Sequence, residues 1–281
     1  MVMVFEDLCP HGYAMKSEAA TLPEAKIVLQ KLARFHAASK ALADTIPVIK
    51  TMANGLGTTD LGKFIEIWLK HFDMIGQLCQ QWPGFEQYTE KLEKLKHPIF
   101  EQLKVVYTPD PTSSWNVLNH GDLHYKNMMF KINEGVTEDI MLLDFQISVW
   151  ATPAIDLLYS LYNTVGAETR HTHREELISY YYEQFAEALK KFGYSKKIPT
   201  LVDLRVELIK AGHLETLVSL VFLPYMVLTP EQLIPQPKSG DPEEGVEMDF
   251  ENVVGCYSYP AVQTLLKQYL PMLNHKGLLD L

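Results

Sequence analysis

The chain has 281 residues, of which 47% are hydrophobic, 21% charged and 11% aromatic, as in a folded protein with a sizeable core. Its formal net charge of −10 argues against binding to nucleic acid or to an anionic membrane surface, since both need clustered positive charge. The most apolar segment, 214–228, is too short to span a membrane and contains Glu215 and Pro224, so a buried helix is expected there. The three cysteines lie far apart without zinc-ligand spacing, and no signal-peptide pattern is present, which favours a cytoplasmic protein.

Helical spacing of apolar residues dominates the chain. Thr21-Leu22-Pro23-Glu24 is a capping box with a proline in the first turn, where the missing N–H costs little. The predicted helices span residues 22–40, 63–80, 85–107, 154–162, 174–192, 201–228 (with a kink near Pro224) and 261–273. Residues 54–62 are expected to form a loop. Residues 230–252 carry prolines and a cluster of acidic side chains, and they are expected to form a flexible acidic surface loop.

Short strands are predicted in two regions. Residues 1–5 are apolar and typical of a strand, and Pro10 and Gly12 indicate a turn after them. Further strands are expected at 117–119, 128–132 and 140–145, with the polar segment 133–139 as a hairpin connection between the last two. The predicted fold class is therefore α+β and mostly helical, with a small β hairpin inserted into the helical body.

The hairpin carries residues that suit phosphoryl transfer. This chemistry needs a carboxylate to orient the attacking hydroxyl and oxygen ligands to hold Mg²⁺. The segment His120-Gly121-Asp122-Leu123-His124-Tyr125-Lys126-Asn127 places an asparagine five residues after an aspartate. Asp144, which Phe145 follows, is predicted to end the apolar strand after the hairpin connection. In this interpretation Asp122 is the base, and Asn127 and Asp144 hold Mg²⁺. His120 is expected to be structural, packing near the Asp-Phe turn.

Two neighbouring side chains allow alternative interpretations. A metal-hydrolase site of His120, Asp122 and His124 would need a further ligand, and His171-Thr172-His173, in a predicted polar turn, has no partner at ligand spacing. His124 would otherwise face solvent or substrate. Asp156, at the start of a predicted helix, either offsets the helix dipole or accepts backbone N–H groups from the catalytic loop and stiffens it.

Several features separate the chain from protein kinases. Gly121 stands where protein kinases carry arginine, Gln146 replaces the glycine of Asp-Phe-Gly, and no Ala-Pro-Glu follows. A small-molecule acceptor is therefore favoured. The tryptophans Trp68, Trp82 and Trp150 are expected to be mostly core residues, although some aromatic side chains would line an apolar substrate pocket.

At these residues the chain resembles the ecdysteroid kinase-like family, also called CHK kinase-like, of the choline/aminoglycoside kinase fold. The segments that carry the resemblance are Glu6-Asp7-Leu8 (the hinge that meets adenine), 35–39 (the first large-lobe helix), 117–130 (the catalytic loop), 142–147 (the metal turn) and 153–159 (its brace). The resemblance implies an ATP- and Mg²⁺-dependent kinase of hydroxylated steroids or other apolar xenobiotics. The family often has tryptophan at the place of His124.

The resemblance also implies a division of the chain. Residues 1–8 would be a remnant strand and hinge of the small lobe, and residues 9–281 would be the large, C-terminal lobe of a kinase-like fold. No lysine precedes Lys16, and Gly55-Leu56-Gly57 is not completed to a Gly-rich loop because Asp60 takes the third glycine position. A chain without the Gly-rich loop and the phosphate-binding lysine is expected to have little or no kinase activity alone, because even one lost donor costs about a hundredfold or more in rate.

Two other functions remain open from the sequence. One is a non-catalytic binding or scaffold protein that keeps the large lobe and its apolar pocket. The other is a non-functional fragment, for which an apolar strand at 1–5 without sheet neighbours would favour aggregation. A kinase should gain stability with MgATP, whereas a binder of apolar ligands should respond to steroid alone. The intact Asp122, Asn127 and Asp144 favour the kinase.

Overall fold

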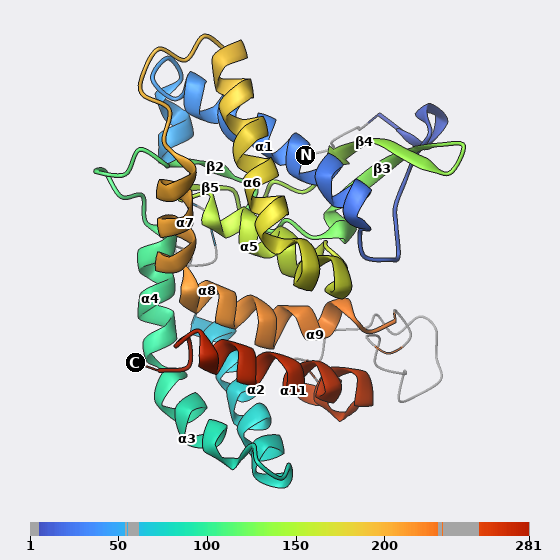
Figure 1. Ribbon diagram of the computed structural model, residues 1–281, viewed down its shortest axis with the longest axis vertical. Coiled ribbons are helices and arrows are strands. Elements are labelled where there is room, and N and C mark those ends of the chain that lie inside the picture. The colour runs from blue at the N-terminus through green and yellow to red at the C-terminus, as the bar shows by residue number, and fades with distance from the viewer. Residues whose placement is uncertain (1–5, 54, 56–61, 230–231, 233–252, 281) are drawn as a thin grey trace. The chain divides into compact units, whose positions relative to one another are not determined.

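A computed structural model describes residues 6–53, 55, 62–229, 232 and 253–280 (Figure 1). The predicted strand at 1–5, most of the predicted loop at 54–62 and nearly all of the acidic segment 230–252 lie outside the described residues. The chain divides into two compact units, one of residues 1–59 with 106–211 and one of residues 60–105 with 212–281. The predicted α+β, mostly helical class is confirmed, with small antiparallel sheets.

The first unit is built on two long helices that pack along each other, α1 (Leu22–Leu42) and α6 (Ala167–Lys191) (Figure 1). The predicted capping box starts α1, since the Glu24 carboxylate accepts the Thr21 N–H at 2.9 Å and the Thr21 hydroxyl at 2.8 Å. Helices α5 (Ala154–Asn163) and α7 (Leu201–Lys210) complete the helical part of this unit.

The first unit also holds both sheets. Strands β3 (Met128–Asn133) and β4 (Val136–Leu142) form the predicted hairpin, and β1 (Tyr13–Ala14) pairs with β3 after a 3₁₀ turn at Cys9–His11. Strand β2 (Val117–Asn119) pairs antiparallel with β5 (Val149–Ala151). Strands β1 and β5 were not predicted, because segments of two or three residues show no alternation of their own.

The hairpin is tighter than the sequence predicted. Its turn consists of Glu134 and Gly135, both with positive φ (49° and 80°), as in a two-residue type I′ turn. The predicted connection at 133–139 and the predicted strand at 140–145 were therefore wrong in their bounds. The N-terminal half of β4 alternates exposed residues with the buried Thr137, so its polar character resembles a loop.

The second unit is helical. Its helices are α2 (Gly62–Gln81), α3 (Glu86–Leu95), α4 (Pro98–Tyr107, which reaches into the first unit), α8 (Gly212–Leu217), α9 (Leu223–Met226) and α11 (Pro260–His275), with a 3₁₀ turn at Val253–Ser258. The single helix predicted over 85–107 was wrong, because Pro98 lacks an N–H and disfavours a helical residue before it. The single helix predicted over 201–228 was also wrong, since α7 ends at Lys210 and α8 begins at Gly212. A π-helical turn, Val218–Phe222, precedes Pro224 where the kink was predicted.

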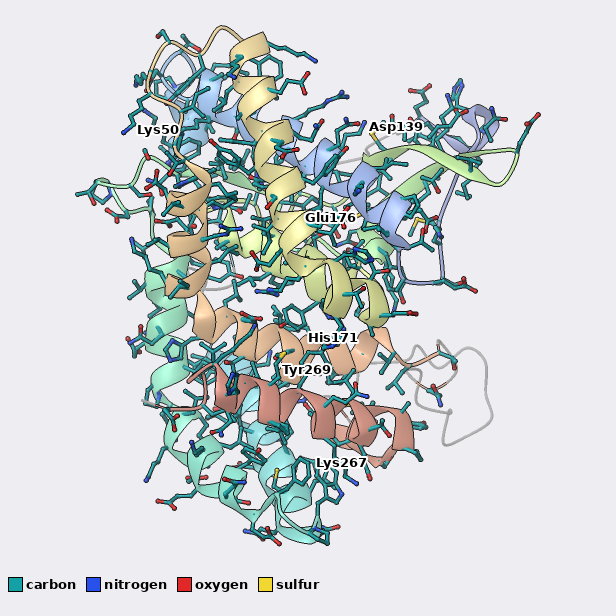
Figure 2. All side chains as sticks on the ribbon, in the orientation of Figure 1. Lys50, Asp139, His171, Glu176, Lys267 and Tyr269 are labelled. Carbon is teal, nitrogen blue, oxygen red and sulfur yellow. The ribbon has the colours of Figure 1, made fainter. Side chains whose placement is uncertain are left out.

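Helix α6 begins earlier than predicted, at Ala167. His171 (Figure 2) and His173 therefore lie on this helix and not in a polar turn. The physical reason is Arg170, whose buried guanidinium donates to the carbonyl oxygens of Leu161 and Val165 at 3.0 and 2.9 Å and so anchors the first turn. Trp68, Trp82 and Trp150 are buried, as predicted. Among the helices of the described residues, none has the length and apolar character needed to cross a membrane.

Candidate active site

Asp122 and Asn127 are joined directly. They lie in the loop that follows β2, and a short 3₁₀ turn, Tyr125–Asn127, brings the asparagine back over the aspartate. The Asn127 Nδ2 group donates to the Asp122 carboxylate and to the Asp122 carbonyl oxygen, each at 3.0 Å. Because the amide nitrogen is used in this way, the Asn127 Oδ1 atom points elsewhere and remains available as an oxygen ligand.

Asp144 is brought to the same end of the hairpin. Met128 pairs with Leu142, and the Leu143 N–H donates to the Asn127 carbonyl oxygen at 2.9 Å, so Asp144 follows directly after a residue bonded to Asn127. Asp144 does not end the strand as predicted, since it lies two residues beyond Leu142 and has a φ of 63°. A left-handed aspartate is a sparsely populated conformation that the surrounding contacts must hold, and such residues gather at functional sites.

His120 holds the turn that contains Asp144. Its Nε2 atom lies 2.6 Å from the Leu143 carbonyl oxygen, and its ring lies 4.7 Å from that of Phe145 between centroids. The His120 side chain is fully buried. The packing predicted for His120 near the Asp-Phe turn is thus present in the structure.

Both carboxylate oxygens of Asp156 accept hydrogen bonds from the backbone of the loop that carries Asp122. Its Oδ2 atom accepts the His120 N–H at 2.6 Å and its Oδ1 atom accepts the Gly121 N–H at 2.9 Å. His36 of α1 approaches the same Oδ2 atom at 3.0 Å, and the Tyr181 hydroxyl of α6 lies 2.7 Å from the other ring nitrogen of His36. Three buried side chains, Asp156, His36 and Tyr181, therefore tie the loop to both long helices, and such satisfied networks make a site rigid.

Sequence reasoning did not assign this role to His36. The residue stood in a segment that resembled a family helix, and a histidine among apolar positions of a helix was the signal that a buried polar partner was needed. Gly121 was noticed only as a departure from protein kinases. Its φ is 91°, and a Cβ atom there would lie 2.2 Å from the Ile147 carbonyl oxygen, so only glycine fits without a shift.

The surroundings of Asp122 keep its carboxylate charged. Burial alone would raise its pKa, but His124 and Asn127 outweigh this effect and hold the pKa of Asp122 below its usual value. The His124 Nε2 atom lies 3.5 Å from the Asp122 carboxylate, while the His124 Nδ1 atom is buried without a hydrogen-bond partner. An anionic carboxylate that is half-buried at the end of a rigid loop is able to orient a hydroxyl group and accept its proton.

The residues of the predicted hinge form local contacts. Asp7 accepts the Cys9 N–H at 2.9 Å, and the Leu8 carbonyl oxygen accepts the His11 N–H at 3.0 Å, so both residues shape the turn before β1. Tyr13 pairs with Lys131, which places the preceding residues toward the turn of the hairpin. Among the described residues, no hydrogen bond joins Glu6, Asp7 or Leu8 to the catalytic loop.

The donor set fits magnesium. Asp144 is exposed, and its carboxylate and the Asn127 Oδ1 atom are the hard oxygen ligands that Mg²⁺ prefers, with the remaining positions normally taken by water and phosphate oxygens. Within the part of the chain that the structure describes, no group of three or more His, Cys, Asp and Glu side chains is arranged to hold a metal ion. The metal-hydrolase interpretation of His120, Asp122 and His124 therefore gains no support.

Comparison with known proteins shows the family of this chain. A search of curated proteins found no significant relative of this chain. The family model described as the ecdysteroid kinase-like family matches residues 1–194, which is more than half of the chain. The match includes the catalytic loop, the hairpin and the Asp156 brace. The chain belongs to the ecdysteroid kinase-like family.

Proposed function

We propose that Asp122, Asn127 and Asp144 serve the transfer of a phosphoryl group from ATP to a hydroxyl group of a small apolar molecule, an ecdysteroid or another hydroxylated xenobiotic. The activity of this chain alone is expected to be low, because Gly55-Leu56-Gly57 is not completed to a Gly-rich loop. The observation that carries the proposal is that the Asn127 amide binds the Asp122 carboxylate directly, while the Leu143 N–H binds the Asn127 carbonyl oxygen and so places the next residue, Asp144, at the same end of the hairpin. Membership of the ecdysteroid kinase-like family supports it. The net charge of −10 suits an uncharged acceptor better than an anionic one.

Each site residue has a part in this chemistry. Asp122 orients the acceptor hydroxyl and accepts its proton as the oxygen attacks phosphorus. Asn127 and Asp144 would hold Mg²⁺, which neutralises charge on the phosphate oxygens when it is bound. The Asn127 amide also restrains the Asp122 carboxylate, because both Asn127 bonds to Asp122 come from one Nδ2 group. Asp156 positions the loop through backbone N–H groups and does not touch the reacting atoms.

The test is phosphorylation of a hydroxylated steroid by purified protein with MgATP, followed by mass spectrometry. Asp122→Asn keeps the shape of the side chain and should lower the rate by about a hundredfold or more, because the carboxylate base is lost. Asp144→Asn should raise the Mg²⁺ concentration needed for half-maximal stabilisation by MgATP. Asp139→Asn is the matched control, since this carboxylate pairs with Lys31 at 2.8 Å, and it should leave the rate unchanged.

Two results would contradict the proposal. One is a rate that Asp122→Asn does not change. The other is that MgATP neither stabilises the protein nor leads to phosphorylation of the steroid, while the steroid alone raises the melting temperature of the protein. That second result would identify a non-catalytic binding protein.

A further inference from the structure

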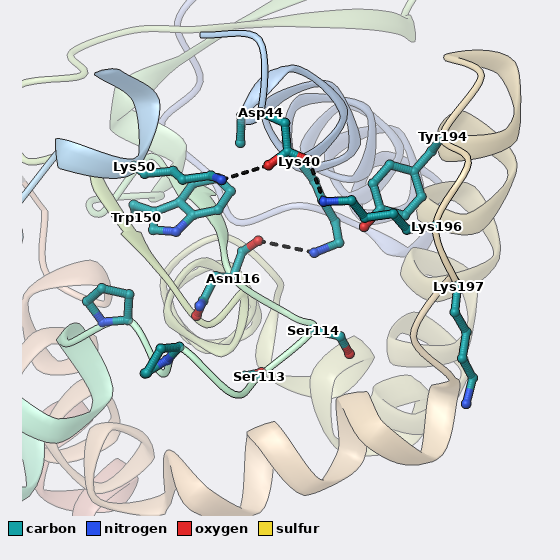
Figure 3. Close-up of a pocket in the computed structure, with 13 residues that line it drawn as sticks. Lys40, Asp44, Lys50, Ser113, Ser114, Asn116, Trp150, Tyr194, Lys196 and Lys197 are labelled. Atoms are coloured by element: carbon teal, nitrogen blue, oxygen red, sulfur yellow. Dashed lines mark hydrogen bonds and ion pairs between the residues drawn. The ribbon is translucent and has the colours of Figure 1, made fainter. Parts of the chain in front are cut away.

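A second site lies in the first unit, at the C-terminal end of α1. A cavity of about 600 Å³ opens between the end of α1, the segment before β2 and the segment after α6 (Figure 3). Its volume is in the range of pockets that hold drug-sized ligands. The lining includes Asp44 and four lysines, which are Lys40, Lys50, Lys196 and Lys197. It also includes apolar and aromatic side chains, which are Trp150, Tyr194, Pro109 and Pro111. We call this cavity the Lys40 pocket.

The Lys40 pocket is positively charged although the chain has a net charge of −10. Asp44 is shared by two lysines, since it contacts Lys50 at 2.7 Å and also pairs with Lys196 (Figure 3). The single negative charge of Asp44 cannot neutralise the three positive charges of Lys40, Lys50 and Lys196. The lysines therefore leave a surplus of positive charge facing one cavity.

Lys40 is the least exposed of these lysines. Its Nζ atom has a long hydrogen bond of 3.5 Å to the Asn116 carbonyl oxygen and lies 5.8 Å from the centre of the Tyr194 ring. Within the described residues Lys40 forms no ion pair. Burial, together with the neighbouring Lys196, lowers the pKa of Lys40 to about 8, so the group is still mostly charged at neutral pH. A partly buried ammonium group without a counter-ion is unfavourable, and an anion in the cavity would remove that cost.

The apolar part of the lining selects the rest of the ligand. Trp150, Pro109 and Pro111 provide an apolar and aromatic surface in the same cavity as the lysines. A bare phosphate ion would occupy only a small part of about 600 Å³. A doubly charged phosphoryl group matches several ammonium groups better than a singly charged carboxylate, because it carries about −1.5 to −2 charges at neutral pH.

From these observations we infer that the Lys40 pocket binds the phosphate monoester of a small aromatic or apolar molecule. The site is distinct from the candidate active site. Asn116 precedes β2 and His120 follows it, so roughly 13 Å of extended chain separates the two along that strand. The inference does not depend on the proposed kinase activity, since it rests on a different set of side chains.

The experiment is isothermal titration of the full chain with phenyl phosphate, inorganic phosphate and phenol. We expect phenyl phosphate to bind at least about tenfold more tightly than either of the other two, because only it engages both the lysines and the apolar part of the lining. Lys40→Met keeps an unbranched side chain one atom shorter and removes the charge, and it should weaken phenyl phosphate binding by about tenfold or more. Lys191→Met, which removes an exposed lysine on α6, is the matched control and should bind like the wild type.

A second variant protects the test against misfolding. Lys196 is 64% exposed, so Lys196→Met should fold normally even if Lys40→Met does not, and it should also weaken binding. Equal binding of phenyl phosphate to the wild type and to either folded variant would overturn the assignment. Equal affinity for phenyl phosphate and inorganic phosphate would refute the inference that the ligand carries an apolar or aromatic group. The absence of saturable binding would refute the inference that the Lys40 pocket binds a phosphate monoester.

Discussion

His36 Nε2 lies 3.0 Å from Asp156 Oδ2, and neither side chain has any exposed surface. The two residues are 120 positions apart along the chain and come from α1 and α5. Because Asp156 also accepts the N–H groups of His120 and Gly121, this contact links the first long helix to the loop that carries Asp122. Its removal should therefore affect both stability and the order of the loop.

Asp156→Ala should lower the free energy of unfolding by about 3–5 kcal/mol, because it leaves buried polar groups without an acceptor. Asp156→Asn keeps one oxygen acceptor and should cost about 1.5–3 kcal/mol. Urea denaturation measures both values, and hydrogen exchange should show faster exchange of the His120 and Gly121 amides. Asp73→Asn, which changes a 47% exposed carboxylate paired with Lys96, is the control and should cost less than about 1 kcal/mol. A cost for Asp156→Ala no larger than that of the control would refute the bracing role.

Gly121 and Gly135 form a matched pair for a test of backbone strain. Both have positive φ, 91° and 80°, but a Cβ atom at Gly135 would meet nothing within 4 Å. Gly135→Ala should therefore cost only the left-handed conformation, about 1–2 kcal/mol. Gly121→Ala should cost at least about 3 kcal/mol, since a backbone carbonyl oxygen must also move. Thermal unfolding of the two variants compares these costs, and equal values would show that the loop at Gly121 adjusts freely.

His71 should make the stability of the second unit depend on pH. The Tyr257 hydroxyl donates to the Leu220 carbonyl oxygen at 2.8 Å and so accepts from His71 Nδ1, which leaves His71 Nε2 to accept the Tyr225 hydroxyl at 3.0 Å. This arrangement requires neutral His71, and burial lowers its pKa to about 4. The unfolded chain binds the proton more tightly, so stability is complete above about pH 6.5 and is lost as the pH falls toward about 4.

The loss should reach roughly 3 kcal/mol and should be absent in His71→Phe. Urea unfolding at a series of pH values across this window measures it. His11→Gln is the control, because His11 is 60% exposed, and it should keep the wild-type pH dependence. An identical pH profile for His71→Phe and the wild type would contradict the prediction.

Glu24 should make the stability of the protein depend on pH in a lower range than His71 does. Burial raises its pKa, but bonds from Lys16, Thr21 and Thr137 outweigh this effect and hold the pKa at about 2. Because the folded pKa is below the unfolded one, its contribution is present above about pH 4.5 and is lost as the pH falls toward about 2. Glu24→Gln should remove this dependence and weaken the start of α1, where the Glu24 carboxylate accepts the Thr21 N–H. Glu138→Gln, at an exposed position of β4, should leave the acid transition unchanged when both variants are followed by circular dichroism.

The errors of prediction have local causes. Apolar residues keep helical spacing through 85–107, so the spacing predicts one helix. Pro98 divides the segment into two helices, because its ring and its missing N–H interrupt the backbone hydrogen bonds without changing the spacing of the apolar residues. The polar residues of β4 resembled a loop because the exposed face of a hairpin is polar. Strand β5 exists only because β2 lies beside it, and no property of three residues predicts a partner that far along the chain.

By itself, the sequence determined the class of the fold, the start of α1 and the set of Asp122, Asn127 and Asp144, because capping, periodicity and motif spacing are local properties. It also identified Asp156 as a candidate brace. Only the tertiary structure decided that His36 and Tyr181 complete this brace and that Lys40, Asp44 and Lys196 surround one cavity. These contacts join segments up to about 150 residues apart, and packing of whole helices, which no local pattern encodes, brings them together.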